Sequence, residues 1–263
     1  MIESKSSEIP TTNEPLIKQV ANWVLAFDVE TIPDEVAAQA KLLLLDTLGC
    51  AIAARHEHAF AAALAVAREL GGTPDCTVIG TRERTSLANA ILLNGTLIRA
   101  LDLNDIYVGP RQSGHPSDNI AVALSFGEAQ NSNGKELLAA IVMGYELYGR
   151  IDDLADPGSP WDHVTVSSLV APAMAGFLLK WKPEQLAHAL AISAAHGNTL
   201  SAVRFGQLSG AKNLANAIVA YTGTLATLLV KHGLTGPLEI LESPRGLAQA
   251  VFGGADLSPL VRP

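Results

Sequence analysis

Charged and aromatic residues are scarce in this sequence: of its 263 residues, 17% are charged and only 5% are aromatic. The 18 lysines and arginines are outnumbered by 26 aspartates and glutamates, which gives a formal net charge of −8. The sequence also lacks a run of Lys and Arg, so we do not expect it to bind nucleic acid. Because the chain is acidic, a site for an anionic ligand needs local cations, and candidate sites should contain Lys, Arg or His.

Cysteine is almost absent as well. The two cysteines, Cys50 and Cys76, lie among apolar residues and belong to no CxxC motif or Cys/His cluster. This pattern excludes the usual zinc and iron–sulfur ligand sets, so we predict no metal site. We expect both side chains to be buried thiols in a reducing compartment.

Neither a signal peptide nor a membrane-spanning segment is apparent in the sequence. Residues 1–13 are polar and lack an apolar core, and we expect them to form a disordered tail rather than a signal peptide. The most apolar stretch, residues 164–179, is shorter than the ~20 residues that span a bilayer. These features predict a cytoplasmic protein without a membrane partner.

Alanine and leucine are abundant and supply most of an apolar content of 48%. They are the best apolar helix formers, and alanine allows helices to approach closely. Apolar residues recur at helical spacing, and the helices predicted from this spacing cover residues 15–27, 33–54, 59–70, 86–100, 120–130, 134–151, 164–180, 183–195, 211–232 and 244–251. With almost no strand signal, the sequence predicts one all-α domain over residues 14–263, of the helix-on-helix kind.

Three local details can be checked against the structure. The helix over residues 33–54 is apolar on nearly all sides, so we expect it to be central. Residues 76–80 are the one strand-like piece, and we expect them to be extended and solitary. Ser86 and the Ser243–Pro244 pair are predicted to begin helices.

The first segment whose side chains could take part in catalysis follows the apolar helix that ends near residue 100. Within a short span it gathers two carboxylates, a carboxamide, a phenol and an imidazole, from Asp102, Asn104, Asp105, Tyr107 and His115. A carboxylate near an imidazole suits proton transfer, because it raises the histidine pKa and fixes its tautomer. The alternative is a solvated turn in which Ser117 or Asp118 caps the next helix.

The second segment ends in Trp161, Asp162 and His163, directly before the most apolar helix. A histidine at the start of a helix has its pKa lowered by the helix dipole, and the neutral imidazole can accept a proton. The alternative is a polar helix start beside a packed tryptophan.

The third segment runs from Arg204 to Lys212 and leads into a long apolar helix. A lysine near a helix N-terminus is unfavourable unless an anion lies beside it. The two cations and the helix start together suit a carboxylate ligand. The alternative is a surface lysine on a polar turn.

Taken in order, five blocks of this sequence resemble the signature blocks of the MmgE/PrpD family, which includes 2-methylcitrate dehydratase and cis-aconitate decarboxylase. The blocks are DTLGCAIAA, NGTLIRALDLNDIY, GHPSDNIAVAL, MGYELYGRI and WDHVTVSSLVAPA. The resemblance extends from about Trp23 to Gly254, with similar gaps between the blocks.

The resemblance implies an all-α domain that forms a homodimer, a pocket for small polycarboxylates and no cofactor. Asp102, His115, His163 and Lys212 stand where the family has its pocket residues. We therefore assign catalysis to Asp102, His115 and His163, and substrate binding to Lys212, Asn104 and Arg204. In this hypothesis Asp102 and His115 transfer the proton, His163 orients or protonates the substrate, and Lys212 binds a substrate carboxylate.

The sequence departs from the family in two ways. Ile106 occupies a position where the family usually has threonine. The family's chains are also much longer and add an α/β lid domain, which we expect to be lost or supplied by a separate lid-domain subunit. We expect a lyase that dehydrates a 2-methylcitrate-like hydroxy acid; the alternatives are a cis-aconitate-type decarboxylase, an epimerase, or a non-catalytic helical subunit that needs a separate lid chain.

Overall fold

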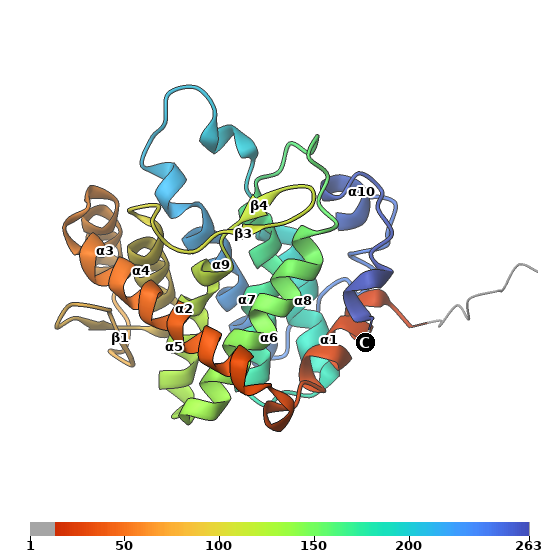
Figure 1. The fold of residues 1–263 in the computed structure, drawn as a ribbon, viewed down its shortest axis with the longest axis horizontal. Helices are drawn as coiled ribbons and strands as arrows, with labels where there is room; N and C mark the ends of the chain where they lie inside the picture. Colours follow the sequence, from red (N-terminus) through yellow and green to blue (C-terminus); the bar gives the residue numbers. More distant parts are fainter. Residues whose placement is uncertain (1–13, 263) are drawn as a thin grey trace, which may run out of the picture.

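The computed structural model describes residues 14–262, so the prediction of a disordered tail over residues 1–13 lies outside the described residues. The described chain is built almost entirely from helices, as the sequence predicts (Figure 1). The α-helices are α1 (Leu16–Leu25), α2 (Asp34–Ala53), α3 (His58–Leu70), α4 (Leu87–Arg99), α5 (Ile120–Gln130), α6 (Gly134–Asp152), α7 (Ser167–Leu178), α8 (Pro183–His196), α9 (Ala211–Lys231) and α10 (Leu247–Val251). Short 3-10 turns include η3 (Pro116–Asn119), η4 (His163–Val166) and η5 (Ser201–Arg204).

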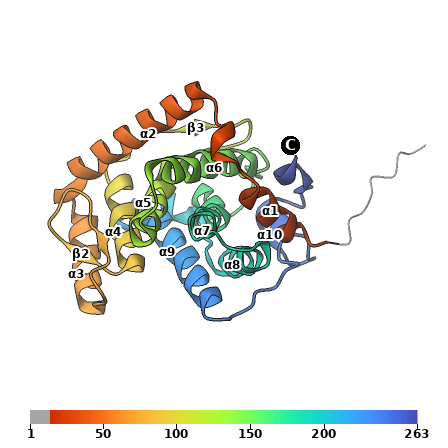
Figure 2. The same cartoon turned by 90° about the horizontal axis from the view of Figure 1, so that it is seen from below.

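Helix α7 lies at the centre of the arrangement and packs against α5, α6, α8 and α9 (Figure 2). Its small residues allow this close packing. A Cβ added at Gly176 would lie 2.7 Å from Cδ1 of Leu186 on α8, which is too close for any side chain. The apolar stretch that the sequence marks over residues 164–179 is therefore the core helix of the domain.

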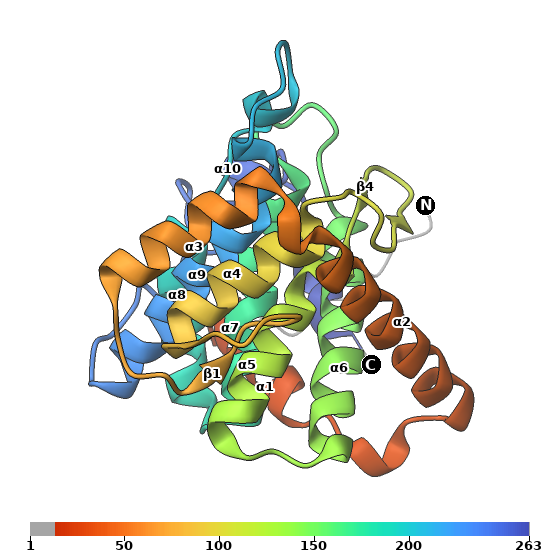
Figure 3. The ribbon, with the colours of Figure 1, turned by 90° about the vertical axis from the view of Figure 1, so that its left-hand side faces the viewer.

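The predicted position of α2 is wrong. This helix lies on the outside of the molecule (Figure 3), and its side chains Leu42, Leu45 and Ile52 are 60%, 67% and 46% exposed. Only one side of α2 packs, mainly against α4 and α6. An apolar surface on all sides therefore does not identify the central helix in this chain, because an exposed face can itself be apolar.

Two small hairpins interrupt the helices. The predicted solitary strand is instead paired, because β1 (Cys76–Thr77) forms an antiparallel pair with β2 (Arg84–Thr85). A second pair, β3 (Tyr107–Val108) and β4 (Ser113–Gly114), lies where the sequence predicts no strand. This second hairpin matters for the site because it leads directly into His115.

The predicted helix starts are partly confirmed. Ser86 does precede α4, but its side chain makes no capping hydrogen bond. The start predicted at Ser243–Pro244 is wrong: Gly246 donates its N–H to the carbonyl of Ser243 in a turn, and α10 begins only at Leu247. Cys50 and Cys76 are both buried and free, as expected.

Two helical segments, residues 34–56 and 211–231, are long and apolar enough to cross a membrane by length and composition alone. Neither segment was predicted from the sequence, in which residues 164–179 are the most apolar stretch. The second segment is the α9 helix, and 56% of its apolar window is buried inside the protein, whereas 22% of the window in the first segment is buried. The predicted cytoplasmic location stays a prediction.

Candidate active site

The three polar segments come together at one end of the helices, at the top of the view in Figure 1. The β3–β4 hairpin, the start of η4 and the segment around η5 all reach this end. Helix α4 contributes its C-terminal residues, and α9 begins here. The fold therefore unites segments that lie more than one hundred residues apart in the chain.

Asp102 and Lys212 form an ion pair, with Nζ 2.7 Å from Oδ2. Arg99 bonds the other oxygen, Oδ1, of the same carboxylate. Asp102 has a left-handed backbone with φ of 58°, which is uncommon outside glycine and typical of constrained sites. Burial alone would raise the pKa of Asp102, but the hydrogen bond from Lys212 and the charge of Arg99 outweigh it and lower that pKa.

A buried polar network lies beneath this pair. Arg99, only 3% exposed, donates from Nη1 to Oδ1 of Asn104 at 3.2 Å. Asn104 in turn donates from Nδ2 to Oγ of Ser117 and to Oδ1 of Asp118, both at 2.9 Å. Burial raises the pKa of Asp118 to about 7, although Arg99 and Asn104 act in the opposite direction. Asn104 therefore lies below the surface and holds its neighbours in position.

The expected capping role of this segment is wrong. Neither Ser117 nor Asp118 accepts a capping hydrogen bond at the start of η3 or α5. Both side chains instead belong to the buried network around Arg99. The linear sequence does not distinguish this role from that of a helix cap.

His115 is held from two sides. Its Nδ1 lies 2.6 Å from the carbonyl oxygen of Asp105, and its backbone N–H donates to the hydroxyl of Tyr148 at 3.2 Å. A carbonyl only accepts, so Nδ1 carries the proton and Nε2 keeps its lone pair. Burial and the charge of Arg99 lower the pKa of His115, and they outweigh the opposite effects of Asp105 and Asp102. Asp102 does raise the pKa of His115, as expected, but burial and Arg99 lower it by more.

His163 lies beside His115, with ring centroids 5.6 Å apart. Its Nδ1 is 3.4 Å from Oδ1 of Asp162, and its Nε2 is 3.4 Å from Nη2 of Arg204. Burial and the positive charge of Arg204 lower the pKa of His163 to about 4, against the opposing effect of Asp162. The lowered pKa was predicted, and burial and the charge of Arg204 lower it.

Arg204 also binds Asp162 with two nitrogens, and Nη2 lies 3.0 Å from Oδ1. The Asp162 side chain bonds the backbone N–H of Val164 as well, which fixes the start of η4. Hydrogen bonds and charge from Arg204 outweigh the burial effect, so the pKa of Asp162 is lowered. The Asp162–Arg204 pair thus positions the His163 ring.

Exposed apolar side chains flank the polar cluster formed by Asp102, His115, His163, Arg204 and Lys212. Leu103, Ile106 and Val108 lie in the segment before and within β3, and they are 69%, 60% and 77% exposed. On the α9 side, Phe205 is 73% exposed and Leu208 is 57% exposed. Exposed apolar residues gathered in this way are typical of a surface that another part of a protein covers.

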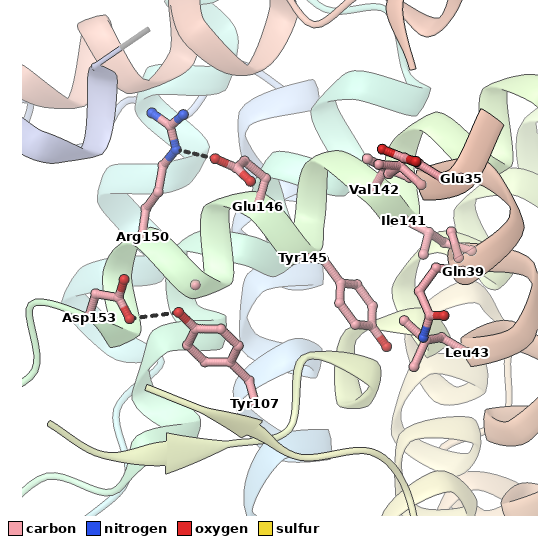
Figure 4. Close-up of a pocket in the computed structure, with 13 residues that line it drawn as sticks. Glu35, Gln39, Leu43, Tyr107, Ile141, Val142, Tyr145, Glu146, Arg150 and Asp153 are labelled. Carbon is pink, nitrogen blue, oxygen red and sulfur yellow. Dashed lines mark hydrogen bonds and ion pairs between the residues drawn. The ribbon is translucent and has the colours of Figure 1, made fainter. Parts of the chain in front are cut away.

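A separate groove of about 490 Å³ lies between α2, α6 and β3 (Figure 4). The tyrosines Tyr107 and Tyr145 line it, and the hydroxyl of Tyr107 donates to Oδ1 of Asp153 at 2.7 Å. None of the residues that the sequence assigns to the site lines this groove. The groove and the histidine cluster are distinct features of the surface.

The cluster combines two cations, Lys212 and Arg204, with two imidazoles whose pKa values are lowered. Cations hold carboxylates, and neutral imidazoles accept protons near pH 7. In residues 14–262, no three His, Cys, Asp or Glu side chains gather in a way that could hold a metal ion. The fold therefore brings two paired cations and two imidazoles with lowered pKa values together at one end of a helical domain.

The chain belongs to the MmgE/PrpD family, because the sequence model of the MmgE/PrpD N-terminal domain matches residues 18–260. Its relatives include the cis-aconitate decarboxylase-like protein oryM of Aspergillus oryzae, 26% identical over 87% of this chain and 49% of the relative. The mitochondrial 2-methylcitrate dehydratase of Yarrowia lipolytica is 26% identical over 97% of this chain and 52% of that protein. The alkylcitrate dehydratase phiI of a fungal species is 30% identical over 82% of this chain and 46% of that protein. The chain thus spans about half the length of the curated relatives it matches.

Proposed function

We propose that this protein is a lyase that acts on a small polycarboxylate and dehydrates a 2-methylcitrate-like hydroxy acid. The observation that supports this most is the placement of Lys212 and Arg204 around two histidines with lowered pKa values. Relatives with the names 2-methylcitrate dehydratase and alkylcitrate dehydratase support the same reaction class.

In the proposed reaction, Nε2 of His115 removes a proton from a carbon next to a substrate carboxylate. This requires a neutral imidazole, which agrees with the lowered pKa of His115. Lys212 and Arg204 bind substrate carboxylates and stabilise the negative charge that develops in the transition state. Because its pKa is lowered to about 4, His163 is neutral and orients the substrate, and the proton that His115 takes up leaves with the hydroxyl group as water. We propose no cofactor for this chemistry.

The geometry favours His115 over Asp102 as the base. Both oxygens of Asp102 are engaged by cations, and its lowered pKa makes it a weak proton acceptor. We therefore assign Asp102 to positioning Lys212. Asn104, which is buried and fully engaged with Arg99, Ser117 and Asp118, supports the site from below rather than touching substrate.

The test is a turnover assay of the purified protein with 2-methylcitrate, following the rise in alkene absorbance. His115→Asn should lower the rate by about 10²–10⁴-fold, the usual contribution of a general base. The exposed His232 provides a matched control, and His232→Asn should leave the rate unchanged. Equal rates for His115→Asn and the wild type would refute the assignment.

Two other reactions of the family remain alternatives. The similarity to the cis-aconitate decarboxylase-like protein of Aspergillus oryzae favours a decarboxylase acting on an unsaturated tricarboxylate. Release of carbon dioxide without a new alkene would identify that reaction. An epimerase would instead invert one stereocentre and would produce neither carbon dioxide nor an alkene.

A second candidate is a helical subunit that works only when another polypeptide covers the site. The exposed side chains of Val108 and Phe205 beside the cluster favour it. The native mass of the purified complex, with every chain identified, distinguishes an enzyme that is active alone from a subunit that needs a second polypeptide. A second chain of lid size would support the subunit, and full activity without one would exclude it.

We also propose a homodimer in which α2 supplies part of the interface. Its exposed Leu42 and Leu45 would lose contact with water on association. Sedimentation of the Leu42→Glu, Leu45→Glu double variant should show monomers where the wild type shows dimers. A wild-type monomer would contradict the proposal.

A further inference from the structure

Arg99, the last residue of α4, is a buried arginine with three polar neighbours. Its side chain is only 3% exposed, and Nη1 lies 2.5 Å from Oδ1 of Asp102. The same nitrogen lies 3.2 Å from Oδ1 of Asn104, and Nε lies 3.7 Å from Oδ2 of the buried Asp118. Because so little of the side chain reaches the surface, Arg99 acts through these neighbours rather than on a ligand.

The contacts of Arg99 join two parts of the site that lie far apart in the chain. Through Asp102 the guanidinium reaches Lys212, whose Nζ lies 2.7 Å from Oδ2 of the same carboxylate. Through Asn104 it reaches η3, because Nδ2 of Asn104 donates to two η3 side chains at 2.9 Å. The residue directly before η3 is His115. One buried side chain therefore contacts both the partner of the substrate-binding cation and the segment that carries the proposed base.

Arg99 is also the cation that acts on His115. The titratable groups around His115 are Arg99 of α4, Asp102 and Asp105 of the loop after it, Asp118 of η3, Tyr148 of α6 and His163 of η4. Asp102 and Asp105 raise the pKa of His115, whereas burial and Arg99 lower it by more. His163 is neutral near pH 7, because its own pKa is lowered to about 4. The charge of Arg99 therefore opposes protonation of the proposed base.

We propose that Arg99 is a positioning residue that holds Lys212 and His115 in one arrangement. It fixes Asp102 beside Lys212, and its charge disfavours the imidazolium form of His115. A guanidinium suits this task because it donates in several fixed directions, whereas a lysine ammonium is a point charge on a flexible stem. This inference rests on the proposed function, in which Lys212 binds substrate and His115 accepts a proton.

Two substitutions separate the effect of the charge from the effect of the geometry. Arg99→Gln removes the charge, so His115 should become easier to protonate. Arg99→Lys keeps the charge but loses the fixed donor directions, so it should preserve the protonation of His115 and still loosen Asp102 and Asn104. A role in folding alone would not make the two variants differ in this way.

NMR titration of the histidine imidazoles measures the protonation of His115 without substrate or turnover, and His115→Asn identifies its signal. We expect His115 to titrate at a higher pH in Arg99→Gln than in the wild type, and close to the wild type in Arg99→Lys. Arg68→Gln, at an exposed arginine paired with Glu83, is the control and should leave the titration unchanged. An equal titration of His115 in Arg99→Gln and the wild type would overturn the proposal.

Calorimetric titration with citrate measures how firmly Lys212 is held. It is done at pH 8, above the ordinary histidine pKa of about 6.5. We expect about tenfold weaker binding in both Arg99 variants, and an affinity equal to that of the wild type would overturn the proposal. If the wild type bound no citrate while His115 still shifted in Arg99→Gln, the proposed function would fail and the role of Arg99 beside His115 would stand.

Removing Arg99 leaves the carboxylate of Asp118 buried without its cation, which is strongly destabilising. If Arg99→Gln does not fold, the double variant Arg99→Gln, Asp118→Asn removes both charges and takes its place in both titrations, with Asp118→Asn as the reference. His115 should again titrate at a higher pH in the double variant than in the reference. No difference between the two would overturn the proposal.

Discussion

The ammonium of Lys212 lies 2.7 Å from Oδ2 of Asp102, although 110 residues separate the two in the chain. A lysine at the start of a long helix needs an anion beside it, and Asp102 is that anion. Because Arg99 holds the other oxygen of Asp102, the carboxylate is fixed between two cations. Lys212 is therefore presented at the surface in a defined position, with 22% of its side chain exposed.

Asp102→Asn should release Lys212 from this position. We expect kcat/KM to fall by about 10–100-fold, because misplacing a substrate-binding group weakens catalysis strongly. Lys212→Ala should have a similar effect, and the double variant should be little worse than either single one, since the two residues act together. Additive losses in steady-state kinetics would contradict the pairing.

The pH dependence of kcat/KM should report His115. A base must be unprotonated, so activity should fall as the pH drops through the pKa of this histidine and stay constant above it. Burial and Arg99 lower that pKa, which places the acidic limb below 6.5. An initial-rate profile from pH 4 to 8 measures the limb. An apparent pKa above 7 would exclude His115 as the base.

Gly114→Ala should destabilise the protein through one contact. The new Cβ would overlap the hydroxyl oxygen of Tyr148, the group that accepts the backbone N–H of His115. We expect a loss of about 2–3 kcal/mol, typical of an overpacked core. Tyr148→Phe removes the overlapping atom and should restore part of the loss in a double-mutant cycle measured by urea denaturation. No rescue would mean that the strain lies elsewhere.

Asp162→Asn should lower stability in a pH-dependent way. Its pKa is lowered in the folded protein, so its contribution is present above the unfolded value of about 3.8 and disappears as the pH falls through the folded value. We expect a loss of about 1–3 kcal/mol at pH 7, less than for a fully buried pair because Arg204 reaches solvent. Urea denaturation at pH 7 and pH 3 should show the difference between variant and wild type shrinking in acid.

The helices could be predicted from the sequence because their apolar spacing is regular, and α5 begins and ends where the spacing places it. Burial could not be predicted in the same way. Helix α2 is as apolar as a core helix, but its position depends on which neighbours α4 and α6 present to it. The partner of β1 was missed because each strand is only two residues long, too short for an alternating pattern.

The candidate site residues could be chosen because the family motifs mark them, but the roles proposed for them depend on contacts between distant segments. Nothing in the linear sequence pairs Arg204 with Asp162 or puts Asn104 beneath Asp102. The burial of Arg99 is equally invisible there, because an arginine at the end of a helix is more commonly solvated.

Binding of a tricarboxylate tests the central claim most directly, because it requires the cluster but no turnover. Citrate is titrated calorimetrically into the wild type, Lys212→Ala and Lys135→Ala, the last a control at an exposed lysine paired with Glu30. We expect citrate to bind the wild type and Lys135→Ala equally, and Lys212→Ala at least about tenfold more weakly, or 1.4 kcal/mol. Equal affinity for Lys212→Ala and the wild type would contradict the account.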